Sequence, residues 1–274
     1  MPDPPTPDPK PPLRRPPRKK RKKERALTHF GGSEFWNEYP WLPFFGPFLL
    51  YLLIGQLAPK ADTPGGAFGF TISYSAYPWF YSAQILITLV AVAVCWRVYL
   101  EFPFRVTFLS VVVGVAGIVV WIVLCKLDLE QRLLVPIGLG KIVEQGERAG
   151  YNPFEYLSGA PAVWSYLGVR FFGLVLLVPL IEEFFLRGFV MRYILARDWL
   201  DVPFGTVTAA TLAAAPIYGV LTHPAEAFAA AAWFGMVTWL MIKTRSIWDC
   251  VVAHAVTNLL LGAWVLWTGE WFFL

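Results

Sequence analysis

The chain alternates between long apolar runs and short polar interruptions. A membrane-spanning helix needs about 20 predominantly apolar residues, with about 17 to 25 the usual range. The pattern therefore predicts an all-α, polytopic transmembrane helical bundle of about seven spans, between about six and eight. Two segments fit least well: the first is short and contains Pro43 and Pro47, and the fifth contains Pro216 and Gly219. The apolar segments are residues 42–57, 79–98, 106–125, 161–185, 205–222, 226–242 and 249–268.

Composition supports lipid rather than water as the surrounding medium. The 274 residues are 57% apolar and 15% charged, with 13 Trp and 22 Phe. A soluble domain carries about 25% charged residues, and aromatic rings favour the membrane–water boundary. The three cysteines, Cys95, Cys125 and Cys250, are widely spaced inside apolar runs. We interpret them as packing residues, because they form no disulfide framework or metal-binding pattern.

The first 25 residues differ from the rest of the chain. They hold nine Pro and ten of the 23 Lys and Arg, so they have almost nothing to bury. We expect residues 1–40 to form a disordered, basic, Pro-rich cytoplasmic tail that contacts anionic membrane lipid, and residues 41–274 to form the transmembrane domain. No nucleic acid partner is expected, because neither aromatic residues nor a folded nucleic-acid-binding module accompanies the tail. A secretory signal is disfavoured, because the basic region is too long and no clear small-residue cleavage site comes after it.

Basic residues also predict an orientation. With the N-terminus inside, 17 Lys and Arg fall on the inner side and five on the outer side, while Arg170 remains inside the fourth span. This asymmetry agrees with the positive-inside rule. We expect a multi-pass integral membrane protein with a cytoplasmic N-terminus, as in a bacterial inner membrane. On the outer side, the stretch from Gln131 to Arg148 predicts a short helix lying on the membrane surface.

Two adjacent acids interrupt the fourth apolar run. Each of Glu182 and Glu183 costs about 2.5–3.5 kcal/mol inside a membrane. Arg187 comes four residues after Glu183, a spacing that favours an ion pair on one helical face. Glu182 lies about 100° around the helix and has no partner nearby in sequence. The spacing predicts a structural Glu183–Arg187 pair, and a Glu182 that faces a polar cavity as a general acid or base. The alternative is that both acids belong to one structural ion cluster.

The last span carries His254 and Asn258, which are four residues apart and share a helical face. Ser246, with an acid three residues later, fits a capping box and predicts the start of this helix. At about 1.5 Å rise per residue, His254 lies about 12 Å from that start, and Glu182 lies about 15 Å from Arg192 at the inner boundary. The side chains of Glu182 and His254 are therefore expected at one depth, where they can meet.

His223 lies between the fifth and sixth segments, directly before a proline. If the fifth helix starts near Phe204, this histidine is about 28 Å from the inner face and far from His254. A helix broken or strongly tilted at Pro216 and Gly219 would bring it closer, since irregular backbone is tolerated where it lines a cavity. The residues alone leave both arrangements of His223 open.

Other chemistries find little support in the sequence. No HExxH sequence occurs, and the pair of His254 and Asn258 supplies only one good zinc ligand, so we expect no metal and no cofactor. No GxSxG elbow or other nucleophile stands beside a histidine, which disfavours a serine triad. A proton-coupled transporter would also use a buried Glu and His, but the internal repeat typical of many transporters is missing.

Three motifs over residues 160–268 resemble those of the CPBP family. This family comprises CAAX-type prenyl-protein endopeptidases and bacteriocin-processing or immunity-associated membrane proteins, and the sequence looks most similar to the branch that accompanies bacterial exosortase systems. One departure is visible: the second family motif is usually Phe-x-x-x-His, whereas Gly219 stands at its first position here, beside Tyr218. The motifs are Glu182-Glu183-x-x-x-Arg187, His223 and His254-x-x-x-Asn258.

The resemblance implies that Glu182 and His223 activate a water molecule. It implies that His254 and Asn258 stabilise the oxyanion on the scissile carbonyl, with the Glu183 ion pair in support. The implied function is metal-independent, glutamate-type hydrolysis of a peptide bond in a membrane-associated or lipidated protein. The alternative is a non-catalytic membrane scaffold or partner-binding protein of the same family, and a proton-coupled transporter is a third hypothesis.

Overall fold

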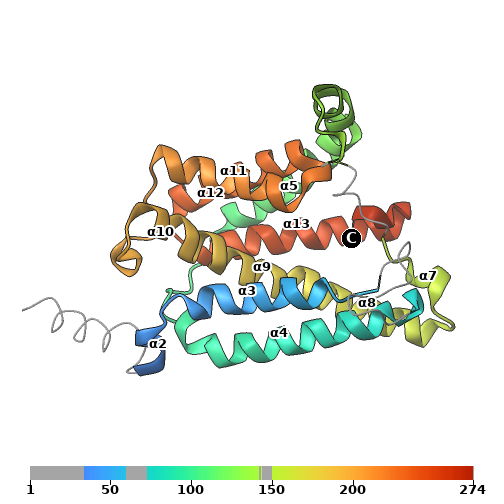
Figure 1. Cartoon of the computed structure of the whole chain (residues 1–274), viewed down its shortest axis with the longest axis horizontal. Helices are drawn as coiled ribbons and strands as arrows, with labels where there is room; N and C mark the ends of the chain where they lie inside the picture. The colour runs from blue at the N-terminus through green and yellow to red at the C-terminus, as the bar shows by residue number, and fades with distance from the viewer. Residues whose placement is uncertain (1–33, 60–72, 142, 144–149, 274) are drawn as a thin grey trace, which may run out of the picture. The chain divides into compact units, whose positions relative to one another are not determined.

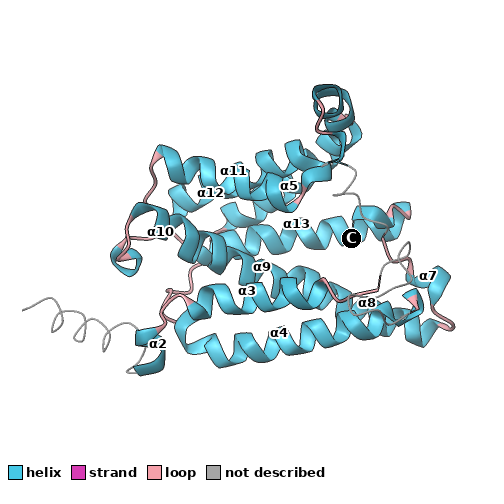
Figure 2. Cartoon of the chain, viewed as in Figure 1, coloured by secondary structure: helices cyan, strands magenta, loops and turns pink. Residues whose placement is uncertain are grey.

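The chain divides into two compact units, Met1–Pro40 and Trp41–Leu274. In the described part of the first unit there is one short helix, α2 (Glu34–Glu38). The predicted disordered tail, residues 1–33, lies outside the described residues. All regular structure in the described residues is helical, which confirms the all-α class (Figure 2). The computed structural model describes residues 34–59, 73–141, 143 and 150–273.

The second unit is built from helices in its described residues (Figure 1). Its α-helices are α3 (Leu42–Gly55), α4 (Tyr77–Tyr99), α5 (Phe108–Lys126), α7 (Pro153–Tyr156), α8 (Ala160–Phe172), α9 (Val178–Glu183), α10 (Met191–Leu195), α11 (Ala209–Thr222), α12 (Ala227–Thr244) and α13 (Ile247–Thr268). The 3₁₀ turns are η1 (Tyr74–Ala76), η3 (Val135–Ile137), η6 (Trp199–Asp201), η7 (Pro224–Glu226) and η8 (Trp271–Phe273). The π-helical segments are η2 (Glu130–Leu134), η4 (Gly173–Leu177) and η5 (Phe184–Val190).

The predicted apolar segments all fold as helices. Four helical stretches of the described chain are long and apolar enough to cross a membrane by length and composition. Two shorter apolar helices, α3 and α11, correspond to the first and fifth segments, which fit the length rule least well. The fourth predicted segment is part of a continuous helical run from Ala160 to Leu195, in which η4 and η5 are inserted between α8, α9 and α10. The four long stretches are Tyr74–Tyr99, Phe108–Lys126, Pro224–Thr244 and Ile247–Thr268.

Helix α13 occupies the centre of this unit. It packs against α5 and α12 on one side and against η4 and α9 on the other, while α3 pairs with α4 and α11 pairs with α12 (Figure 1). Gly114 and Gly117 let α5 approach α13 closely. A Cβ atom at Gly114 would come within 2.6 Å of the Val256 side chain, and one at Gly117 within 2.9 Å of Thr257. Small residues are enriched at such contacts in membranes, because close packing rather than water exclusion drives helix association there.

The predicted surface helix around Gln131 to Arg148 is described only in part. Its described portion contains η2 and η3, and residues 142 and 144–148 lie outside the described residues. The carboxylate of Glu130 is buried and accepts a hydrogen bond of 2.9 Å from the backbone N–H of Phe228, in the first turn of α12. This contact satisfies one of the N-terminal amides of the helix and connects the loop to α12.

Candidate functional site

The two acidic residues of the fourth predicted apolar segment, residues 161–185, lie at the end of α9. Glu182 and Glu183 are both buried, and Arg187 is fully buried one turn later in η5. Arg187 Nη1 contacts Glu183 Oε2 directly, which confirms the predicted pair. The Nη2 atom of Arg187 also donates to the carbonyl oxygen of Phe234 at 3.1 Å. Arg187 therefore connects η5 to α12 while it pairs with Glu183.

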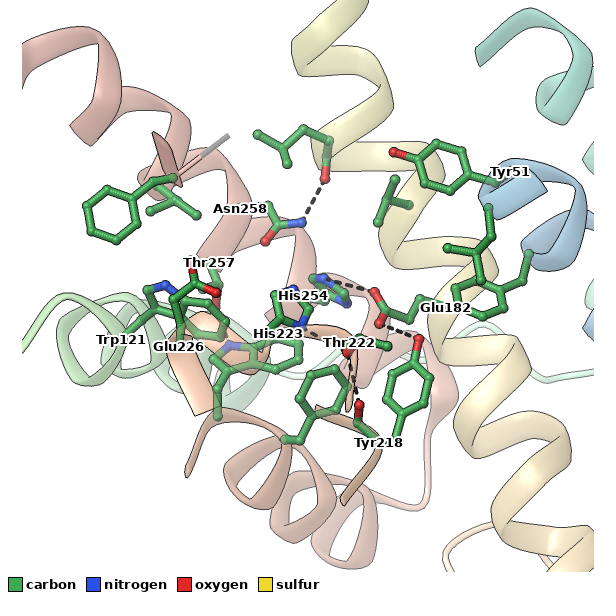
Figure 3. A pocket seen from close by; sticks show the side chains of 18 of the residues that line it. Tyr51, Trp121, Glu182, Tyr218, Thr222, His223, Glu226, His254, Thr257 and Asn258 are labelled. Atoms are coloured by element: carbon green, nitrogen blue, oxygen red, sulfur yellow. Dashed lines mark hydrogen bonds and ion pairs between the residues drawn. The ribbon is translucent and has the colours of Figure 1, made fainter. Parts of the chain in front are cut away.

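Glu182 contacts His254 of α13. His254 Nε2 lies 3.8 Å from Glu182 Oε2, so the two residues are at one depth, as predicted (Figure 3). The other ring nitrogen, Nδ1, lies 3.1 Å from Glu183 Oε1. His254 thus contacts both adjacent carboxylates. The sequence did not predict the second contact, because the helical spacing assigned Glu183 to Arg187 alone.

The start of α13 is only partly as predicted. Ser246 is the N-cap residue, and its side chain accepts from the backbone N–H of Asp249 at 3.4 Å. The predicted return contact of the capping box is wrong. Instead, Asp249 Oδ1 accepts from the backbone N–H of Thr107 at 2.6 Å and from its hydroxyl at 3.1 Å. The carboxylate therefore binds the residue before α5 rather than the backbone of its own N-cap.

Asn258 lies one turn after His254 and contacts the fourth span. Its Nδ2 atom donates to the carbonyl oxygen of Leu174 at 2.9 Å. This carbonyl is available because the π-helical hydrogen bond of Val178 goes to Gly173, and the next residue, Pro179, has no N–H. The π segment and the proline together leave an acceptor inside the helix, and Asn258 satisfies it.

His223 lines the same cavity as the other candidates. It is the C-cap residue of α11, and its Nδ1 atom lies 2.9 Å from Thr222 Oγ1. Helix α11 is continuous through Pro216, so the break considered for this position is not present. The helix begins at Ala209 rather than near Phe204, because η6 and a loop occupy the preceding residues. The helical path from Ala209 to His223 is therefore about 21 Å long, rather than the length of about 28 Å predicted from Phe204.

Tyr218 is a site residue that no sequence pattern indicated. Its hydroxyl group donates a hydrogen bond of 2.7 Å to Glu182 Oε1 (Figure 3). The neighbouring Gly219 is the position where the family motif usually has phenylalanine. A Cβ atom there would lie 2.4 Å from the ring of Phe234, so the Phe234 ring of α12 occupies the space instead. The departure from the motif therefore leaves the wall beside His223 aromatic.

An aromatic residue of α12, Trp233, packs against His254. The Trp233 ring lies 4.6 Å from the His254 ring at an interplanar angle of 66°. Its Nε1 donates to Thr257 Oγ1 at 3.1 Å, and the hydroxyl of Thr257 lies 2.9 Å from the Gly114 carbonyl oxygen. Sequence spacing could not identify these partners, because they come from three different helices.

The four candidate catalytic residues, Glu182, His223, His254 and Asn258, line one cavity of about 290 Å³ (Figure 3). Besides the predicted residues, polar and charged groups of its wall include Arg170 and Glu226, and much of the remainder is apolar or aromatic. Within the described ranges, no group of three or more His, Cys, Asp and Glu residues is arranged to hold a metal ion. The groups of the wall that can donate or accept a hydrogen bond include Tyr81, Arg170, Glu182, Tyr218, His223, His254 and Asn258.

The part of the chain that forms the cavity is similar to a known protein family. Residues 164–260 match the family of Rce1-like type II CAAX prenyl endopeptidases. The match confirms the predicted relationship to the CAAX proteases and supports an intramembrane protease in general. The Rce1-like region spans about a third of the chain and includes both ends of the predicted motif set, from Glu182 to Asn258. No curated protein and no solved structure matches the chain.

Proposed function

We propose that the protein is a glutamate-type endopeptidase that hydrolyses a peptide bond within the membrane without a metal ion. The observation that carries this proposal is the setting of Glu182. Its carboxylate accepts from Tyr218 and faces His254, in a cavity that His223 and Asn258 also line. The Rce1-like match of residues 164–260 supports the same reaction class.

In the proposed reaction, Glu182 and His223 bind a water molecule and Glu182 accepts its proton as the water oxygen attacks the scissile carbonyl carbon. The carbonyl oxygen becomes an oxyanion. When the C–N bond breaks, the proton held by Glu182 passes to the departing amine, so the carboxylate is regenerated. General acid–base catalysis of this kind contributes about 10²- to 10⁴-fold to the rate.

His254 and Asn258 are the proposed oxyanion donors. The carboxylate of Glu183 can only accept hydrogen bonds, so the 3.1 Å contact uses a proton on His254 Nδ1. Donation from Nε2 to an oxyanion then requires a second proton on the ring, whose positive charge lies beside the carboxylates of Glu182 and Glu183. Asn258 Nδ2 carries two protons and uses one on Leu174, which leaves the other for the substrate.

The substrate is proposed to be a membrane-associated or lipidated protein. The cavity wall combines the ionisable groups with apolar side chains, including Phe48, Leu52 and Val178. Such a wall suits a peptide whose side chains or attached lipid are apolar, because burying apolar surface stabilises the complex by about 25 cal/mol per Å².

The test is cleavage of a peptide library in proteoliposomes by the wild-type protein and by Glu182→Ala, each with and without a chelator. We expect Glu182→Ala to lower the rate by about 10²- to 10⁴-fold and the chelator to have no effect. Glu155→Gln, which alters an exposed acid away from the cavity, serves as the control. Glu183→Gln is expected mainly to reduce folded yield, because it leaves Arg187 buried without a counter-charge.

Four outcomes contradict this proposal. Cleavage that survives Glu182→Ala removes the assigned role, and loss of cleavage with chelator alone indicates metal chemistry. A fully folded but inactive Glu183→Gln protein reverses the assignment of the two glutamates. Absence of any cleavage, together with retained binding of a partner protein, favours the scaffold alternative.

A further inference from the structure

Arg170 is a cation in the cavity that the proposed reaction does not use. It lies in α8, ten residues after the start of that helix at Ala160, which is about 15 Å along the axis. Its guanidinium carbon lies 4.5 Å from the centre of the Tyr81 ring, and the hydroxyl of Tyr81 donates to the backbone carbonyl of Arg170 at 3.3 Å. Both side chains line the cavity that contains Glu182.

The surroundings of Arg170 contrast with those of the other two arginines in the helical run from Ala160 to Leu195. Arg187 pairs with Glu183, and Arg192 donates to three backbone carbonyl groups. In the described part of the chain, no carboxylate forms an ion pair with Arg170. Its neighbours there are tyrosine side chains. An intramembrane cation without an anion is costly, and such residues usually belong to a substrate or ion pathway.

The π segment aligns Arg170 with Glu182. The two residues are 12 positions apart, which in a regular α-helix would separate their directions by about 120°. A π-helical turn accommodates one additional residue, so η4 reduces the effective separation to about 11 α-helical steps. These steps leave a difference of about 20° from three full turns. Arg170 and Glu182 therefore face the same side of the helix, in agreement with their shared cavity.

Their separation suits a peptide. Eleven α-helical steps correspond to about 16 Å along the axis. An extended chain covers about 3.3–3.6 Å per residue, so about five residues would connect the reacting bond at Glu182 to an anion at Arg170. The planar guanidinium group binds carboxylates through two parallel hydrogen bonds, which gives directional as well as electrostatic selectivity.

We propose that Arg170 binds a carboxylate of the peptide substrate and so sets the distance between that carboxylate and the bond that is cleaved. This subsite rests on the proposed endopeptidase function of Glu182. The carboxylate comes either from the C-terminus of the peptide or from an acidic side chain near it, since both present the same group to the guanidinium.

The experiment measures binding to the full chain in detergent micelles, with Glu182→Gln present so that no peptide is turned over. Three fluorescent apolar peptides are compared: a free C-terminal acid, its carboxamide, and a carboxamide that ends in Asp. We expect at least one carboxylate peptide to bind roughly 10- to 100-fold more tightly than the plain carboxamide. Which of the two does so identifies the source of the carboxylate.

Adding Arg170→Gln is expected to remove this preference while leaving the affinity for the plain carboxamide unchanged. Arg170→Lys should retain part of it, because the charge remains but the bidentate geometry is lost. Arg197→Gln, an exposed arginine outside the cavity, is the control for a general change in charge and should retain the full preference. If Arg170→Gln does not fold, the proposal is still tested by comparing the three peptides on the protein with Arg170 present and on Arg170→Lys.

Equal binding of all three peptides overturns the proposal, as does a preference that survives Arg170→Gln. Absence of saturable binding of any peptide also overturns it. These results require no turnover, so they can be separated from the proposed function. A retained carboxylate preference together with no cleavage by the wild-type protein counts against the peptidase and supports the subsite.

Discussion

The hydrogen bond from Tyr218 to Glu182 fixes one oxygen of the carboxylate and leaves the other facing His254. A hydrogen bond to a charged group contributes about 1.5–3 kcal/mol. In the proposed reaction this energy orients Glu182 toward the water molecule that it activates. Tyr218 is therefore a positioning residue in this proposal, because it acts through Glu182 and not on the substrate.

Replacing Tyr218 with phenylalanine tests this role. The ring is kept and the hydroxyl is lost, so Tyr218→Phe should lower kcat by roughly 10- to 100-fold with little change in KM. Cleavage kinetics and thermal unfolding would be measured together, with Tyr193→Phe, an exposed tyrosine of α10, as the control. An unchanged kcat would show that Glu182 is oriented without this hydrogen bond.

At the residue scale, local contacts were predictable and tertiary ones were not. The Glu183–Arg187 pair is expected from a four-residue spacing within one helix, and the common depth of Glu182 and His254 from helical rise. The Tyr218 hydrogen bond depends on how α11 packs, which no spacing in the sequence specifies. The return contact of the predicted capping box is wrong for the same reason. Asp249 binds Thr107 instead, which lies 142 positions away in the chain.

Helices were predicted more reliably than their irregularities. Apolar length was sufficient to identify the helical segments, because a lipid environment requires backbone hydrogen bonds to be satisfied within each helix. The π segments were not predicted, since one extra residue does not interrupt a run in which nearly every position is apolar. Their effect on the site is nevertheless large: η4 supplies the Leu174 carbonyl to Asn258 and turns Arg170 toward the cavity.

The contact between α5 and α13 gives a test at the scale of helices. In Gly114→Ala the new methyl group would lie 2.7 Å from the Ala253 backbone oxygen and 2.6 Å from the Val256 side chain. We expect a loss of about 1–3 kcal/mol in stability, because the backbone atom cannot move aside easily. The measurement is thermal unfolding in detergent.

Gly168→Ala is the matched control for this substitution. No atom lies within 4 Å of a Cβ placed at Gly168, which is exposed in α8. Alanine in a helix is favoured over glycine by up to about 1 kcal/mol, so stability should be unchanged or slightly higher. Equal destabilisation by both substitutions would show that the close approach of α5 and α13 does not limit stability.

For the whole molecule, the positive-inside rule predicts that the N-terminal tail and Arg197 face the cytoplasm while Arg132 faces outward. Arg132→Cys and Arg197→Cys would be labelled with a membrane-impermeant maleimide in sealed vesicles whose outer face is exposed. Both positions are exposed. We expect Arg132→Cys to react and Arg197→Cys to react only after the membrane is permeabilised.

The parent chain serves as the blank in this labelling experiment. Cys95 and Cys250 are buried and Cys125 is half-buried, so little background reaction is expected. The reverse labelling pattern would invert the predicted orientation and assign the tail to the other side of the membrane.

The position of His254 and Asn258 on α13 has a consequence for the biogenesis of the protein. A ribosome synthesises these two residues after Glu182 and His223, and α13 must then insert between α5 and the fourth span before the proposed oxyanion donors meet the glutamate. If the proposed function holds, a nascent chain that has not yet inserted α13 is inactive. Newly made protein would thus gain its hydrolytic activity only when assembly of the bundle around α13 is complete.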